Sequence, residues 1–137
     1  MEIRGTGSYL PGKIITNDDL SEVVDTNDEW ISSRTGICQR HISEGETTSE
    51  MAAKAAVAAL EDAEVSPEEV ELIIVATMTG DEAMPGTACK VQKEIGAVHA
   101  ACFDLSAACT GFVFALNTAN AYLASGMYRN ADRKSVV

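Results

Sequence analysis

Two hydrophobic periods alternate along the chain, and the switches between them predict an α/β fold. Residues 72–77 form a continuous apolar run, which is typical of a strand covered on both faces. Residues 47–62 instead begin with Thr47 and Glu50 at the spacing of a capping box and continue as an alanine-rich stretch, so a helix is predicted there. The small side chains of this helix would let it lie close against a sheet or another helix.

Capping and turn residues complete the predicted order of elements. Asn17 and Asn27 each precede acidic residues and can cap two short helices, the second of which ends at Gly36. Strands are predicted over 1–7, 72–77 and 100–105, helices over 47–62, 85–96 and 109–124, and the start of a last strand at 136–137. Because strands alternate with helices, we expect one domain with a mainly parallel, mixed sheet and helices on both faces. The helix over 109–124 is apolar nearly all round, so we expect it to be buried.

The composition narrows the functional classes. Lysine and arginine total 10 against 21 aspartates and glutamates, a formal net charge of -11, which disfavours binding to nucleic acid or to an anionic membrane. No apolar run approaches the roughly 20 residues that cross a bilayer, and the first residues lack the pattern of a secretory signal. The four cysteines lack metal-ligand spacing. We therefore expect a cytoplasmic protein with reduced thiols and no metal site.

Cys109 is the most informative candidate for chemistry. It follows an expected strand and a tight turn and opens the last expected helix, an arrangement similar to a nucleophile elbow. Backbone N–H groups and the positive end of the helix dipole would favour a thiolate there and would stabilise an oxyanion on an attacked thioester. Small neighbouring residues would leave room for an acyl chain: Ala107, Ala108 and Gly111.

The alternative interpretation is that Cys109 is a small buried hydrophobic residue, the more common role of a cysteine. The other cysteines lack the strand–turn–helix setting, so packing accounts better for Cys38, Cys89 and Cys102. A thiol redox function is disfavoured because no second cysteine lies near Cys109 in the sequence.

A second group of residues suits a nucleotide. Trp30 and Arg34 lie four residues apart, on one face of a short predicted helix. An indole beside a guanidinium offers stacking for a base and positive charge for a phosphate. The alternative is a core tryptophan and a solvated arginine. His41 and His99 are isolated in the sequence, and we expect each to be a surface or packing residue.

Four sequence blocks together resemble one family. They occur in family order at Gly5–Pro11, Thr16–Leu20, Asp28–Ile37 and Phe103–Phe112. They are similar to the N-terminal half of β-ketoacyl-acyl-carrier-protein synthase III, the thiolase-like enzyme that starts type II fatty acid synthesis. The resemblance implies that residues 1–137 are a truncated thiolase-like half-domain with a buried helix that bears the nucleophile, and that the C-terminal half is absent.

The resemblance also implies an activity and the roles of particular residues. Cys109 would take an acetyl or branched acyl group from acyl-CoA, and malonyl-acyl carrier protein would then lose carbon dioxide and attack the resulting thioester. Trp30 would stack on the adenine of coenzyme A, with Arg34 beside the nucleotide and Thr26 nearby. Met84 would reach across a dimer interface to line the partner's acyl pocket. Coenzyme A is thus expected as a thioester substrate, with no permanently bound cofactor, and the partners as the carrier protein and a second copy or complementary half.

The family takes its catalytic histidine and asparagine from its second half, and residues 1–137 resemble only the first half. Without them decarboxylation has little to drive it, so we expect this chain alone to be inactive as a condensing enzyme. Two alternatives stay open. One is a non-catalytic partner subunit or remnant that associates with a complementary half, and the other is a thiolase-like synthase of the polyketide or long-chain type.

Overall fold

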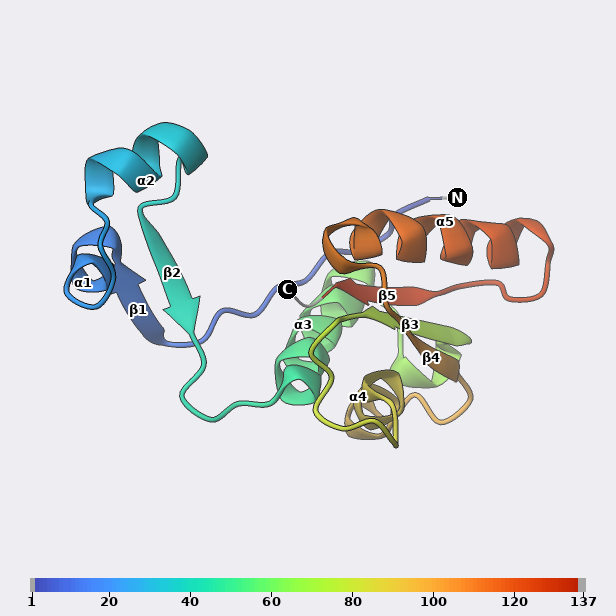
Figure 1. Ribbon diagram of the computed structural model, residues 1–137. Helices are drawn as coiled ribbons and strands as arrows, with labels where there is room; N and C mark the ends of the chain where they lie inside the picture. Colours follow the sequence, from blue (N-terminus) through green and yellow to red (C-terminus); the bar gives the residue numbers. More distant parts are fainter. Residues whose placement is uncertain (1, 136–137) are drawn as a thin grey trace. The chain divides into compact units, whose positions relative to one another are not determined.

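The computed structural model describes residues 2–135 and divides the chain, predicted as one domain, into two compact units. The sheet unit comprises Met1–Tyr9 and Thr47–Val137, and the hairpin unit comprises Leu10–Glu46 (Figure 1).

The sheet unit is built on three parallel strands. These are β3 (Leu72–Ala76), β4 (Ala101–Leu105) and β5 (Asp132–Ser135), in the spatial order β4-β3-β5. Leu72 lies opposite Ala101 on one side of β3, and Ile73 lies opposite Asp132 on the other. All residues of β3 are buried, as its continuous apolar run predicts for the central strand of a covered sheet.

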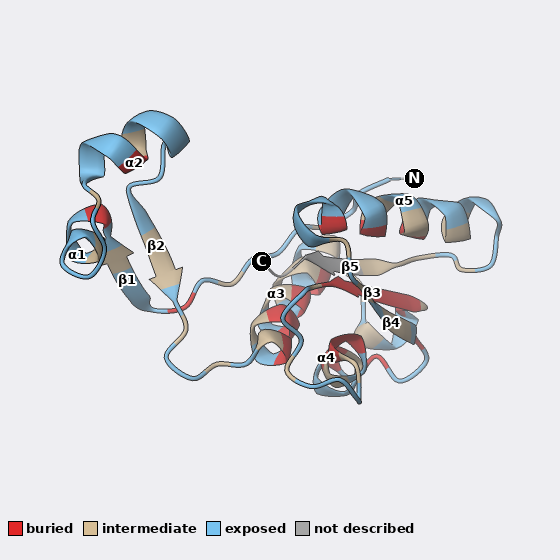
Figure 2. Ribbon diagram, in the orientation of Figure 1, coloured by how far each residue is buried: buried red, intermediate tan, exposed pale blue. Residues whose placement is uncertain are grey.

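Helices cover both faces of this sheet, which confirms the expected α/β fold. On one face, Ile73 and Val75 pack in a core with α3 (Thr48–Ala63) and α4 (Thr87–Ile95). On the other face, Leu72 and Ile74 pack against α5 (Gly111–Ala124). Figure 2 shows burial concentrated in β3 and on the helix faces that meet the sheet. Two single-turn 3-10 helices, η1 (Pro67–Glu69) and η2 (Ala108–Thr110), lie in the connections.

The expected burial of the last helix is wrong in this chain. Only one stripe of α5 is buried, through Gly111, Ala115 and Ala119. Phe112, Val113 and Phe114 are about half exposed. The sheet covers one face of the helix, and Val113 and Phe114 stay more than half exposed within residues 2–135. No helix among the described residues is long and apolar enough to cross a membrane.

The N-termini of helices α3 and α4 are capped differently. Thr47 Oγ1 accepts from the backbone N–H of Glu50, and Glu50 Oε2 accepts from the N–H of Thr47 at 2.8 Å, so the predicted capping box is confirmed. α4 has no such cap at Gly86. Instead, the Asp104 carboxylate accepts from Thr87 N at 2.6 Å and Ala88 N at 2.7 Å. This bond pair ties the start of α4 to β4.

The strand predicted over residues 1–7 is not formed; residues 2–9 run along α3 without joining a sheet. A Cβ atom at Gly5 would lie 2.5 Å from the Ala59 carbonyl oxygen, and one at Gly7 would collide with the Ala55 carbonyl. The backbone therefore lies directly on the small-residue face of the helix, where side chains larger than hydrogen do not fit. The predicted close approach of the alanine-rich helix to a sheet and another helix is confirmed, because Ala52, Ala53 and Ala56 pack in one core with β3 and α4. The extended segment lies against the same helix in addition.

The polar segment before the expected last strand also differs from the prediction. The strand expected at Val136 and Val137 lies outside the described residues, and the polar segment Asp132–Ser135 forms β5. Hydrogen bonds from one side chain hold the backbone just before this strand. Asn130 bonds the backbone on both sides of Val70, accepting from Glu71 N at 2.9 Å and donating to Glu69 O at 2.7 Å.

The hairpin unit contains two strands that the hydrophobic pattern does not predict. β1 (Lys13–Thr16) pairs antiparallel with β2 (Gln39–Ile42), and α1 (Asn17–Ser21) and α2 (Asp28–Thr35) lie between them in the chain. Both short helices were predicted. The cap at Asn27 is confirmed, because its side chain accepts from Trp30 N at 2.8 Å. The cap at Asn17 is wrong: Thr16 caps α1, and Asn17 is buried and donates to Asp28 Oδ1 and Ile37 O at 2.7 Å each.

Candidate active site

Cys109 lies in η2, between the end of β4 and the start of α5. The predicted strand–turn–helix setting is therefore present, with one 3-10 turn inserted before the α-helix. The turn is closed by Thr110, whose N–H and hydroxyl both donate to Ala107 O, at 3.1 and 2.7 Å. The positive end of the α5 dipole faces this turn, which suits an oxyanion that develops there.

The backbone at Ala108, directly before the cysteine, is strained. Its φ is 45°, in the left-handed region, which costs a non-glycine residue about 1–2 kcal/mol. Only two non-glycine residues in the described chain have positive φ; the other is Glu64, which ends α3. Strain of this kind persists where the surrounding structure holds it, and it often marks functional turns. The sequence carries no signal for this strain, because a left-handed turn position is usually marked by glycine or asparagine and position 108 is an alanine.

The surroundings of Cys109 correct one detail and exclude one alternative. Cys109 is exposed, which argues against its interpretation as a buried packing residue. Gly111 was predicted to leave space for a substrate, and this prediction is wrong. Gly111 is buried, and a Cβ atom there would lie 3.1 Å from Ala76 Cβ. Gly111 thus lets α5 begin in contact with β3, while Ala107 and Ala108 lie in the turn itself.

Neither histidine forms a pair with Cys109 within the sheet unit. His99 is exposed in the turn before β4, so the length of the strand, about 13 Å, separates it from the end where Cys109 lies. His41 belongs to the hairpin unit, and its Nδ1 is 2.6 Å from Pro11 O. Among the described residues, no three histidine, cysteine or acidic side chains gather as a metal site.

Trp30 and Arg34 are in contact on α2, as their spacing predicts. The Arg34 guanidinium lies 4.6 Å from the centre of the Trp30 ring, and Arg34 Nη1 donates to Trp30 O at 3.3 Å. Trp30 is 53% exposed, so it is not a core tryptophan. Thr26 is half-buried just before the helix cap. The pair presents an aromatic surface and a positive charge to solvent, and its role in binding a nucleotide stays a prediction.

Met84 lies in the loop between β3 and α4 and is 86% exposed. The following peptide bond, Met84–Pro85, is cis. An apolar side chain this exposed is available to a partner surface, and the predicted contact with a second copy stays a prediction.

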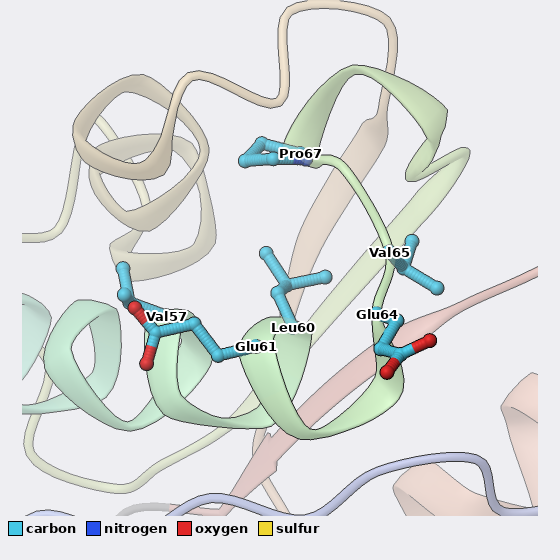
Figure 3. Close-up of a pocket in the computed structure, with 6 residues that line it drawn as sticks. All are labelled: Val57, Leu60, Glu61, Glu64, Val65 and Pro67. Atoms are coloured by element: carbon cyan, nitrogen blue, oxygen red, sulfur yellow. The ribbon is translucent and has the colours of Figure 1, made fainter.

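The pocket drawn in Figure 3 is separate from Cys109. It has a volume of about 310 Å³ and is lined by residues of α3, the following turn and the start of η1: Val57, Leu60, Glu61, Glu64, Val65 and Pro67. α3 and α5 pack on opposite faces of the sheet. No nucleophile or positive charge lines the pocket, so we assign it no part in the chemistry of Cys109.

Two features of the sheet unit were missed by sequence reasoning. One is the pair of hydrogen bonds that the Asp104 carboxylate accepts from the backbone at the start of α4. The other is a contact between Cys89 and Cys102, whose Sγ atoms lie 3.4 Å apart. Both arise where a helix packs beside a strand, and neither leaves a local motif.

Comparison with known sequences points to one family. The family description 3-Oxoacyl-[acyl-carrier-protein (ACP)] synthase III matches residues 103–131. The chain is 60% identical over 131 residues to the β-ketoacyl-[acyl-carrier-protein] synthase III of Clostridium acetobutylicum, covering 96% of this chain and 40% of that protein. It is 58% identical over 130 residues to the same protein of Desulfitobacterium hafniense, covering 94% and 39%. The chain thus spans about 40% of the length of the curated relatives it matches.

Solved structures agree. The 3-oxoacyl-[acyl-carrier-protein] synthase III of Aquifex aeolicus VF5 superposes with a TM-score of 0.95 at 48% identity, over 98% of this chain and 44% of that one. The priming β-ketosynthase of the R1128 polyketide pathway superposes with a TM-score of 0.91 at 39% identity, over 98% and 41%. These similarities confirm the thiolase-like α/β fold.

Proposed function

We propose, from its match in sequence and fold to part of β-ketoacyl-[acyl-carrier-protein] synthase III, that this chain carries the acyl-accepting segment of such a condensing acyltransferase. The relatives that it matches bear the name of this enzyme, which initiates fatty acid synthesis. The observation that carries the proposal is Cys109 itself, exposed on a strained turn at the positive end of α5.

The first proposed step is acyl transfer to Cys109. Its thiolate attacks the carbonyl carbon of an acyl-CoA thioester and forms a new carbon–sulfur bond. Coenzyme A leaves as a thiolate with the electron pair of the broken bond. The α5 dipole and the backbone of the turn lower the energy of the oxyanion that forms on the attacked carbonyl. We assign Trp30, Arg34 and Thr26 to binding the nucleotide of coenzyme A, since the exposed Trp30–Arg34 pair offers stacking and charge.

The second step of the family, condensation with malonyl-acyl carrier protein, requires groups that protonate and stabilise a carbanion. His99 is at the far end of β4 from Cys109, and the sequence spans only about 40% of its relatives. We therefore propose that these 137 residues alone accept an acyl group without condensing it. A second copy or a complementary half is the proposed partner, with Met84 at the contact, and the cytoplasm is the proposed location.

Acylation is tested by incubating the chain with radiolabelled acetyl-CoA and locating the label by peptide mass spectrometry. We expect one acyl group on Cys109 and none in Cys109→Ser. Cys38→Ser, another exposed cysteine, is the matched control and should be labelled as the wild type. Equal labelling of Cys109→Ser, or robust 3-oxoacyl product from the wild type with malonyl-acyl carrier protein, would contradict the proposal.

One observation favours a second candidate, a non-catalytic partner subunit. Val113 and Phe114 on α5 are more than half exposed within the described residues, and exposed apolar side chains of this size favour association. Sedimentation velocity distinguishes the candidates, because a stable, well-folded monomer would argue against a subunit that needs a partner.

Substrate class is a separate question. The 39% identity to a priming β-ketosynthase of polyketide synthesis favours a polyketide-type starter as the alternative to acetyl, and a long-chain acyl group is the other alternative. Measuring which acyl-CoA labels Cys109 fastest separates these alternatives.

A further inference from the structure

Cys89 and Cys102 form a thiol pair that the sequence does not reveal. Cys89 lies on α4 and Cys102 on the adjacent strand β4, 13 positions later, and their Sγ atoms are 3.4 Å apart. Cys89 is exposed and Cys102 is half-buried. The exposed thiol is therefore open to a small oxidant, and the second thiol lies directly behind it.

The two elements that carry these thiols are held together on both sides of the pair. On one side, the Asp104 carboxylate accepts from the first two backbone N–H groups of α4. On the other side, Gln92 Nε2 donates to Ala100 O at 2.6 Å, and Gln92 Oε1 lies 3.4 Å from Cys102 Sγ. The helix and the strand are thus held together by the bonds to Asp104 and by the Gln92–Ala100 bond, none of which involves a thiol.

We propose that Cys89 and Cys102 are an oxidisable dithiol that a peroxide converts into an intramolecular disulfide. The Cys89 thiol attacks one oxygen of the peroxide, the O–O bond breaks, and Cys89 becomes a sulfenic acid with release of water. Cys102 then attacks the sulfenic sulfur, the S–O bond breaks, and the departing hydroxide takes the proton of Cys102 as a second water. In sum, two thiols and one hydrogen peroxide give one disulfide and two waters, and the peroxide is the species reduced.

The geometry makes the second step a short one. A disulfide bond is about 2.05 Å long, so the sulfur atoms need to approach by only about 1.4 Å. The order of the steps follows from exposure. Burial and the neighbouring Cys89 thiol raise the pKa of Cys102 to about 11, so Cys102 is a poor initial nucleophile toward peroxide and acts as the resolving thiol. Cys109 takes no part, and the inference is independent of the proposed acyl transfer.

The test is oxidation of the full chain with hydrogen peroxide, followed by blocking of free thiols and digestion without reductant. Trypsin cleaves after Lys90 and Lys93, and an aspartate-specific protease cleaves before Asp104, which separates Cys102 from Cys109. We expect a linked peptide pair containing Cys89 and Cys102 that has lost two hydrogen atoms and disappears after treatment with dithiothreitol.

Variants provide the controls. Cys89→Ser and Cys102→Ser should each lose the linked peptide, and Cys102→Ser should accumulate a sulfenic acid at Cys89 that dimedone traps. Cys38→Ser should keep the linkage. If a serine variant does not fold, Cys102→Ala replaces it, and the wild-type peptide map stands without any variant. Oxidation of Cys89 to a sulfinic acid with Cys102 still free, or disulfides that join other cysteines or different chains, would overturn the proposal.

Discussion

The carboxylate of Asp104 holds the first turn of α4 against β4, and its removal is the sharpest test of how this part of the sheet unit is stabilised. α4 begins at Thr87, and its N-cap residue, Gly86, has no side chain to accept the first backbone N–H groups. Asp104 supplies that acceptor from the neighbouring strand, at 2.6 Å to Thr87 N and 2.7 Å to Ala88 N. Thr87 and Ala88 are buried, so water does not readily replace the lost partner.

The expected magnitude follows from these two bonds. A hydrogen bond to a charged group contributes about 1.5–3 kcal/mol, and loss of a helix cap costs typically about 1 kcal/mol. Asp104 itself is exposed, so solvent screening reduces the first figure. We expect Asp104→Ala to lower the free energy of unfolding by about 2 kcal/mol, and Asp104→Asn, which keeps one neutral acceptor, by about 1 kcal/mol. For a chain of this size, 2 kcal/mol corresponds to a fall in Tm of about 8 °C.

The assay is urea unfolding followed by far-ultraviolet circular dichroism, together with hydrogen exchange of individual amides. The midpoint should fall without a change in slope, and the amides of Thr87 and Ala88 should lose protection, because Asp104 is the partner that the structure gives them. Asp25→Ala is the matched control: Asp25 is exposed and makes no bond within the described residues, so its effect should stay within about 0.5 kcal/mol. An Asp104→Ala variant with an unchanged midpoint and unchanged exchange at both amides would refute the reasoning.

Three further outcomes are expected. Gly7→Ala places a Cβ atom against the backbone of α3 and should lower the free energy of unfolding by about 1–3 kcal/mol. Gly12 has open space around it, so Gly12→Ala should change the free energy of unfolding little. Equal effects of the two variants would contradict the close packing at Gly7. Hydrogen bonds from Arg129 hold the pKa of Glu71 below its usual value of 4.5. The pair therefore stabilises the fold above pH 4.5, and this stabilisation is lost as the pH falls through the folded-state pKa. Glu71→Gln should flatten the decline in stability below pH 4.5 in acid titrations, and an unchanged decline would argue against the pair. Trp30→Ala should weaken coenzyme A binding by about 1–3 kcal/mol in calorimetry if the indole stacks on the base, and unchanged affinity would remove that role.

Several parts of the fold were predictable because their determinants are local. The capping box at Thr47 and the cap at Asn27 act on backbone groups three residues away. A continuous apolar run predicts a buried strand whichever elements pack against it. The turn before Cys109 was predicted for the same reason, since a strand, small residues and a helix follow one another directly.

Other parts were missed because they depend on packing between distant segments. Residues 1–7 have the composition of a strand, yet the backbone at Gly5 lies on α3, where the space left by alanine side chains decides its path. The polar strand β5 forms because β3 offers it an unpaired edge, and polarity alone argues against a strand there.

The amino-acid sequence alone determined the alternation of strands and helices, the position of Cys109 at a strand–helix turn and the spacing of Trp30 from Arg34, since each depends on residues within a few positions of one another. Only the tertiary structure decided that one face of α5 stays open, that Asp104 caps a helix from another element and that Cys89 meets Cys102. The physical reason is that burial and side-chain contact are set by which elements pack together, and that depends on the whole set of apolar faces at once.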